Sequence, residues 1–176
     1  NLGVGGATLK GFSLGIKEKF DILFKIDGDG QHEPKDISKF LNKLKKKDVN
    51  FCKGTRFKNS YNIRKIPKIR LIGNIFLTFL TKINCRNFNF TDAVNGYLAI
   101  KSSLLRKLNF SKISNDFFFE EDLIFQISHF EKNINEVQIK TIYKNKSSLK
   151  PIKIIFSFFF KHLRNFFRRA VYDLSK

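Results

Sequence analysis

The sequence lacks two amino acids altogether and is poor in several others. It contains no methionine and no tryptophan, three prolines, two cysteines, and 15 acidic residues against 34 lysines and arginines. Because an open reading frame begins with methionine, a chain that opens on Asn1 is expected to be a fragment of a longer protein or a processed chain. Cys52 and Cys85 match no metal-ligand spacing and are too few for a disulfide framework. We expect two reduced, partly buried thiols.

Long apolar runs are missing as well. The longest charge-free stretch of the C-terminal tail is "IIFSFFF", residues 154–160, whereas a helix that spans a bilayer needs roughly 20 apolar residues. Nothing at the start of the chain resembles a signal peptide. The sequence therefore predicts no membrane-spanning helix of its own.

The residues that are present describe one basic, folded domain. The chain has 176 residues, 42% of them hydrophobic, and a formal net charge of +19. This hydrophobic content excludes a disordered chain. The excess of positive charge predicts an anionic partner, which could be a membrane surface, a nucleic acid or a phosphorylated substrate.

Helical and strand patterns alternate along the chain. Residues 1–20 start as a glycine-rich loop and continue as a helix, and the apolar run 21–26 follows as a buried strand. The expected helices after it are 35–48, 69–83, 102–108 and 117–132, and the expected strands are 49–57, 94–100 and 134–143. This alternation predicts an α/β fold built on one sheet. No internal repeat or linker divides it.

The tail from residue 151 onwards has its own character. Its pattern predicts an amphipathic helix with a basic face formed by Lys161, Arg164 and Arg168. The residues of the expected apolar face are Ile152, Ile155, Phe156, Phe159, Leu163, Phe166 and Phe167. Two interpretations fit this periodicity equally well: a helix lying on an anionic membrane surface, or a helix packed on its own domain with a solvated basic face.

The stretch "KIDGDGQHEP" carries the strongest chemical signal. A calcium EF-hand loop starting at Asp27 would need glycine at position 6 and glutamate at position 12, where this chain has His32 and Ser38. On an extended chain Asp27 and Asp29 face the same side, so both carboxylates can reach one Mg²⁺ or Mn²⁺ ion. The alternative is a solvated turn. Glycines at positions 3–6 strengthen the site interpretation, because backbone amides at a helix start can bind a diphosphate or a sugar.

Seven motifs taken together resemble the family 2 glycosyltransferases, and most closely the branch of dolichol-phosphate mannose synthase and the bacterial polyprenyl-phosphate glycosyltransferases. In chain order they are "NLGVGGA", "DGDGQHEP", "KGTRF", "PKIRLIGN", "TDAVNGYLAI", "FFFEEDLIF" and "NEVQIKTIY". The resemblance implies a GT-A fold, that is, a Rossmann-like mixed sheet with flanking helices, followed by the basic amphipathic helix. Residues 1–150 would be the catalytic domain without its N-terminal nucleotide-binding strand, and 151–176 a membrane-surface helix.

The resemblance also implies roles for individual residues. Asp29 would hold the metal with Asp27 as its partner, and Glu120 and Asp122 would be the carboxylates near the acceptor. Acids that merely favour the start of a helix are the competing interpretation of this acidic pair. The implied donor-binding residues are Asn1, Gly3, Gly5, Gly6, Asp27 and Gln31. The implied acceptor- and sugar-binding residues are Arg56, Arg70, Asn74, Asp92, Asn95, Gly96, Tyr97, Tyr143 and Ser147.

The implied activity is inverting sugar transfer that depends on Mg²⁺ or Mn²⁺. The donor would be a nucleotide sugar and the acceptor a polyprenyl phosphate. The enzyme would lie at the cytoplasmic face of the plasma membrane, held by residues 151–172 or by a further C-terminal segment, and no nucleic acid is expected. Three departures from the family pattern bear on the acceptor and the donor: Ala93 stands where relatives commonly have proline, Lys144 and Lys146 replace an acidic pair, and the upstream strand is absent. We therefore expect this chain alone to bind a donor poorly.

Two other functions stay open. A basic nucleic-acid- or membrane-binding module would explain the charge and the aromatic content. An inactive scaffold that keeps the glycosyltransferase fold would explain the two lysines.

Overall fold

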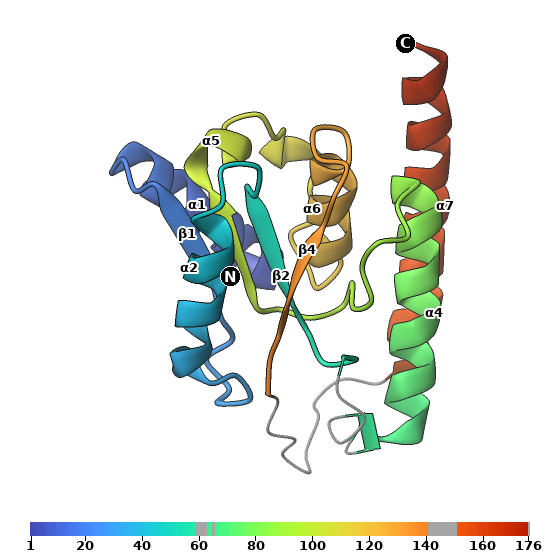
Figure 1. Ribbon diagram of the computed structural model, residues 1–176. Coiled ribbons are helices and arrows are strands. Elements are labelled where there is room, and N and C mark those ends of the chain that lie inside the picture. Colours follow the sequence, from blue (N-terminus) through green and yellow to red (C-terminus); the bar gives the residue numbers. More distant parts are fainter. Residues whose placement is uncertain (59–62, 65, 141–150, 176) are drawn as a thin grey trace.

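The computed structural model describes residues 1–58, 63–64, 66–140 and 151–175, and leaves aside the side chains of 151–155. A four-stranded mixed sheet forms its centre (Figure 1). Its strands are β1 (Ile22–Lys25), β2 (Phe51–Thr55), β3 (Leu98–Lys101) and β4 (Asn135–Gln138), in the order β1-β3-β2-β4. Strand β3 runs antiparallel to both of its neighbours, and β2 and β4 are parallel. The predicted α/β architecture is confirmed.

Helices cover the sheet and extend to one side of it. They are α1 (Gly3–Lys17), α2 (Ile37–Leu44), α4 (Lys68–Cys85), α5 (Ser102–Leu105), α6 (Phe119–Ile127) and α7 (Pro151–Leu174), with 3-10 turns η1 (Pro34–Asp36) and η2 (Phe110–Lys112). Helices α4 and α7 pack against each other at the edge of the molecule opposite to α2 (Figure 1).

The alternation of side chains along β3 creates two cores. Leu98 and Ile100 belong to the larger core, which contains residues of α1, α5 and α6. Ala99 belongs to the smaller core, which contains Phe40 and Leu44 of α2. Successive residues of a strand point to opposite faces, so this short strand supplies both cores. The two cysteines are free, as expected, and they are buried more completely than the partial burial that was predicted.

The glycine-rich start of the chain differs from the prediction. It is not a loop, because helix α1 begins at Gly3 and includes the other glycines. A methyl group added at Gly5 would lie 2.6 Å from Cβ of Phe119 and also against the carbonyl oxygen of Ser114. The amide of Gly6 donates to the carbonyl oxygen of Asn115 at 3.0 Å. The glycines therefore let α1 approach residues 114–119 closely.

This packing predicts opposite effects for two glycines of one helix. Gly5→Ala is expected to lower the free energy of unfolding by about 2 kcal/mol, because the added methyl group overpacks a backbone contact. Gly11→Ala is expected to raise it by about 0.5 to 1 kcal/mol, because Gly11 is exposed and has nothing within 4 Å of the added carbon. Urea unfolding of the two variants measures both changes. Equal effects would show that α1 does not depend on this approach.

Helix α7 packs on its own domain, but not through the expected faces. Its buried side chains are Phe158, His162 and Asn165. Asn84 of α4 meets His162, with 3.1 Å between the Asn84 side-chain nitrogen and His162 Nδ1. Burial lowers the pKa of His162 to about 4, so this contact involves a neutral imidazole near pH 7. Helix α7 points His162 and Asn165 inward because they are hydrogen-bond partners for the buried side chains of Asn84 and Asp122.

The side chains predicted for the apolar face of α7 are largely solvent-exposed. Phe156 is 68% exposed and Phe167 is 60% exposed. Helix α4 also exposes apolar side chains, among them Ile72 at 68% and Phe79 at 52%. In the part of the chain that the structure describes, no helix has both the length and the apolar character needed to cross a membrane.

Candidate active site

A pocket of about 420 Å³ opens beside the C-terminal end of β1. Open α/β sheets commonly bind ligands beyond the carboxyl ends of their strands. Asp27 and Asp29 follow β1 and contribute to its polar wall, as does Glu120 from the first turn of α6. The other predicted residues that line it are Gln31, Arg56, Arg70, Asn74, Asn95 and Gly96. Lys25, His32, Gly28 and Gly73 line it as well, and its apolar side chains are Val4, Ile69, Leu77, Val94, Phe117 and Phe158.

An ion-paired lysine connects two of the predicted carboxylates. The Nζ atom of Lys25 lies 2.6 Å from Asp27 Oδ1 and 3.2 Å from Glu120 Oε1. Burial alone lowers the pKa of Lys25, but the attraction of Glu120 and Asp27 outweighs it and the pKa is raised. Gly96 leaves room for this cluster, because a Cβ there would collide with Asp27 and Lys25.

A second lysine lies deeper beneath the pocket. Lys53 is fully buried and its Nζ atom donates to the carbonyl oxygen of Asn95. The same nitrogen lies 4.0 Å from Glu120 Oε2. Burial lowers the pKa of Lys53, although Glu120 acts in the opposite direction. Neither lysine was among the predicted site residues. The available signal was a lysine inside an apolar strand, where an uncompensated charge is costly.

The Asp-Gly-Asp loop has the donor groups that a hard divalent cation prefers. Gln31 holds the Asp29 carboxylate twice, through its backbone amide at 2.9 Å and its side-chain amide at 2.7 Å. Gly30 adopts φ of +72°, which favours glycine. The described residues contain no cluster of three or more His, Cys, Asp or Glu side chains suited to a metal. Two carboxylates still fit Mg²⁺, which usually binds through one or two carboxylates and completes its shell with water and substrate phosphates.

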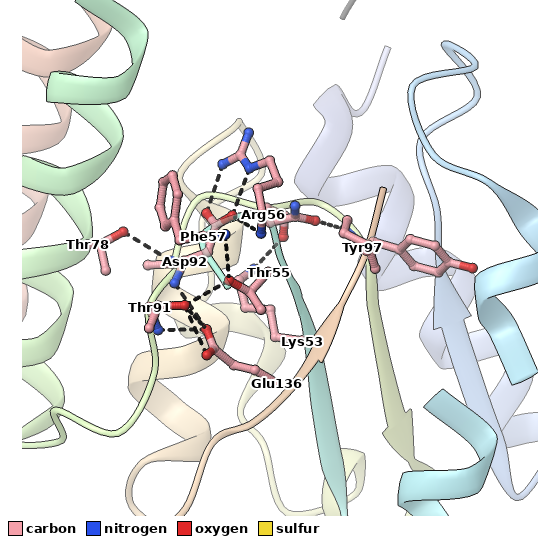
Figure 2. A network of polar contacts seen from close by, with 12 residues as sticks. Lys53, Thr55, Arg56, Phe57, Thr78, Thr91, Asp92, Tyr97 and Glu136 are labelled. Atoms are coloured by element: carbon pink, nitrogen blue, oxygen red, sulfur yellow. Dashed lines mark hydrogen bonds and ion pairs between the residues drawn. The ribbon is translucent and has the colours of Figure 1, made fainter. Parts of the chain in front are cut away.

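Arg56 reaches the pocket from a rigid polar network (Figure 2). Its guanidinium donates two hydrogen bonds to the carboxylate of Asp92, at 2.7 and 2.8 Å. Glu136 in turn accepts from the backbone amides of Thr91 and Asp92, at 2.6 and 3.1 Å. Thr78 of α4 accepts from the amide of Ala93 at 3.1 Å. The network fixes the direction of the Arg56 side chain.

Three of the predicted site residues do not line this pocket, and partners within the protein hold their side chains. Asp92 is fully buried and clamps Arg56 instead of lining the pocket. The ring of Tyr97 points away from Arg56 (Figure 2) and stacks on Phe40, with 4.6 Å between ring centroids. Asp122 accepts from Ser114, Arg164 and Asn165, so its carboxylate joins α6 to α7. The cause is the same in each case, because a fully buried polar side chain is held by the nearest partners within the protein.

The predicted donor residues at the start of the chain lie outside the pocket wall, although Val4 of the same helix contributes to it. Asn1 caps α1 through its side-chain oxygen, which accepts from the amide of Gly3 at 3.1 Å. Gly3, Gly5 and Gly6 pack against or beside residue 115. Two predicted acceptor residues, Tyr143 and Ser147, fall outside the described residues, as do Lys144 and Lys146.

Comparison with known proteins provides an independent view of this arrangement. Residues 1–108 match the family described as Glycosyl transferase family 2. The chain is 30% identical over 158 residues to the UDP-N-acetylglucosamine–dolichyl-phosphate N-acetylglucosaminyltransferase of Methanococcus voltae, an alignment that covers 90% of this chain and 62% of that protein. It is 28% identical over 142 residues to the undecaprenyl-phosphate mannosyltransferase of Micrococcus luteus, covering 78% of this chain and 56% of that protein.

The chain thus spans about three fifths of the length of these curated relatives. Among solved structures it is similar to glucosyl-3-phosphoglycerate synthase from Mycobacterium tuberculosis, with a TM-score of 0.54 and 14% sequence identity. That match covers 82% of this chain and 48% of the other. It confirms the predicted GT-A fold.

Proposed function

The chain belongs to glycosyl transferase family 2, and on that basis we propose that it transfers a sugar from a nucleotide-sugar donor to a polyprenyl phosphate. One observation carries the proposal. A single pocket combines the two aspartates of the loop after β1, the guanidinium of Arg56 and a wall of apolar side chains. A nucleotide diphosphate, an acceptor phosphate and an isoprenoid chain are ligands whose chemistry matches these three surfaces.

We assign Mg²⁺ or Mn²⁺ to Asp29 and Asp27. When bound, such an ion supplies positive charge that stabilises the diphosphate as it leaves. Lys25 holds one oxygen of Asp27 at 2.6 Å and thereby orients that carboxylate. Gln31 does the same for Asp29 through two hydrogen bonds.

The acceptor end of the pocket favours an anion attached to an apolar chain. Arg56 and Arg70 both line it, and arginine matches the geometry of phosphate oxygens. Leu77, Phe117 and Phe158 add apolar surface beside them. A phosphate acceptor is already ionised and needs no base. Glu120 then serves as the counter-ion that positions Lys25 and Lys53, in keeping with its distances of 3.2 and 4.0 Å from their Nζ atoms.

The exposed apolar side chains of α4 and α7 support a location at the membrane. They lie on two helices that pack together at one edge of the molecule (Figure 1). Exposed apolar patches of this kind usually mark an interaction surface, and the chain carries a net charge of +19. We propose that this edge lies on the anionic cytoplasmic surface of the plasma membrane, where a polyprenyl phosphate is available.

A nucleotide titration tests the transferase proposal. UDP and GDP are titrated by calorimetry with and without Mn²⁺, both into this chain and into the protein translated from the full reading frame. In the protein from the full reading frame, one of the two nucleotides is expected to bind only when the metal is present. Asp29→Asn is expected to weaken that binding at least about tenfold, because a metal ligand is lost. Asp48→Asn removes an exposed acid at the far end of α2 and is the matched control.

Binding that ignores both the metal and Asp29 would refute the assignment of the loop as a metal site. Binding of neither nucleotide to the full-length protein would refute the transferase proposal. Salt-sensitive RNA binding that survives Asp29→Asn would favour a nucleic-acid-binding module instead.

A further inference from the structure

A second groove lies on the side of α6 away from the candidate active site. Its volume is about 840 Å³, and α6, α7 and residues 107–112 form its walls. None of its lining residues lines the first pocket. Phe125, Phe130 and Phe167 give it an apolar surface.

The charges of this groove are of one sign. Four cations line it, from Lys107, Lys112, Arg164 and Arg168, and no carboxylate does among the described residues. Asp122 behind the wall neutralises Arg164 at 2.9 Å. Three of the four positive charges are therefore left without a carboxylate partner at salt-bridge distance in the described chain.

Arg168, one of these unpaired cations, is held by an aromatic ring and a side-chain amide. Its guanidinium lies over the ring of Phe125, 5.6 Å from the centroid, and donates to Asn165 at 3.2 Å. Burial lowers the pKa of Arg168, Asp122 partly offsets this effect, and Arg164 adds to it. The contacts with Phe125 and Asn165 leave other N–H groups of the Arg168 guanidinium available to donate to an anion. Arginine matches a phosphate group in shape as well as in charge.

The groove continues into the exposed apolar stripe of α7. Phe167 and Val171 line the groove and are still 60% and 67% exposed. Phe160 and Leu174 extend the same stripe at 55% and 89% exposure. A ligand that presents a phosphate to the cations could therefore lay an apolar chain along the helix without leaving the surface.

We propose that this groove binds the phosphate headgroup of an anionic phospholipid, with an acyl chain along Phe167 and Val171. The proposal rests on the membrane association proposed above and adds a defined lipid site to it, separate from the site of sugar transfer. A soluble phosphate would not use the apolar part of the groove, whereas a membrane lipid uses both parts. A lipid bound to these cations would fix the side of α7 that faces the bilayer.

Vesicle co-sedimentation tests the proposal. The wild-type protein is mixed with phosphatidylcholine vesicles, with and without phosphatidylglycerol. Phosphatidylglycerol is expected to raise its affinity, and Lys107→Gln/Lys112→Gln is expected to lower the affinity for anionic vesicles about tenfold or more. Both lysines are exposed and have no ion pair in the described chain, so the variant is expected to fold normally.

Matched variants separate a defined site from general charge. Lys45→Gln/Lys47→Gln removes the same charge just after α2, at two exposed residues that do not line the groove, and should change the affinity less than about twofold. Phe167→Ser should weaken binding to both kinds of vesicle. Equal losses for the two lysine pairs would overturn the site in favour of diffuse attraction.

The remaining outcomes are also decisive. Release from anionic vesicles by inorganic phosphate, but not by sodium chloride of equal ionic strength, would make the groove a site for free phosphate. A dimer that sedimentation velocity detects in the wild type but not in the lysine variant would make a second copy the occupant. Absence of any vesicle binding would overturn both this site and the membrane location. The nucleotide titration would still decide the transferase proposal.

Discussion

Asp122→Ala is expected to lower the free energy of unfolding by about 3 kcal/mol, because it removes a buried carboxylate whose three partners lie on two other segments of the chain. Asp122 is 0% exposed. It accepts from the backbone amide of Ser114 at 2.9 Å, from Arg164 at 2.9 Å and from Asn165 at 2.7 Å. The amides of Ser114 and Asn165 would lose an acceptor inside the protein. Arg164 is 46% exposed and can turn to water, which limits the loss.

Urea unfolding measures this change, and limited proteolysis shows whether α7 has become cleavable. Asp116→Ala is the control, since its carboxylate is 55% exposed and pairs with Lys161 at the surface. Its loss should cost about 1 kcal/mol or less. A catalytic role for Asp122 would give the opposite pattern, with normal stability and lost sugar transfer. That pattern would restore the prediction made from the sequence.

Glu120→Gln is expected to reduce kcat for sugar transfer about a hundredfold, whereas the neighbouring Glu121→Gln should leave it within about twofold. Glu120 lies between two lysines, and its loss frees Lys25 to pair with Asp27 alone. Both side-chain oxygens of Glu121 are buried and have no hydrogen-bond partner among the described residues. Burial, reinforced by Glu120, raises its pKa well above the usual range. Burial thus favours the uncharged form of the Glu121 side chain, and glutamine has nearly the same shape as that form.

The assay follows release of the nucleotide while a nucleotide sugar and a short-chain polyprenyl phosphate are turned over by the full-length protein. Calorimetry reports donor affinity in parallel and should change little for either variant, because neither glutamate belongs to the Asp-Gly-Asp loop that we propose binds the metal. Equal kcat values for the two variants would show that the Lys25–Glu120 pair is not part of the transfer machinery.

The fold could be predicted from the sequence because its signals are local. Apolar periodicity placed the strands and most helices, since one buried face is enough to specify each element. The expected strand 49–57 corresponds to β2, and the expected helix 69–83 lies within α4 (Lys68–Cys85). The predicted loop at the start of the chain was wrong, because a cluster of glycines in a sequence usually indicates a loop. Their use as contact points appears only when residues 114–119 are in place.

The candidate site was only partly predictable for a related reason. Among the predicted residues that line the pocket, Asp27, Asp29 and Gln31 lie in the loop that follows β1, where the sequence pattern alone locates them. Asp92, Tyr97 and Asp122 are equally polar in the sequence, but each is held inside the protein by a distant partner. Lys25 and Lys53 reach the site from inside strands, where a sequence pattern predicts an apolar residue.

The sequence by itself determined the α/β alternation, the family and the Asp-Gly-Asp loop at a strand end, because each depends on residues close together in the chain. Only the tertiary structure decided which of the carboxylates of Glu120 and Asp122 faces the pocket and which face of α7 turns inward. Both choices depend on partners more than 35 residues away: Lys25 for Glu120, and Arg164 and Asn165 for Asp122. A buried charged side chain is oriented by its charged or polar partners, and these partners come together only when the chain has folded.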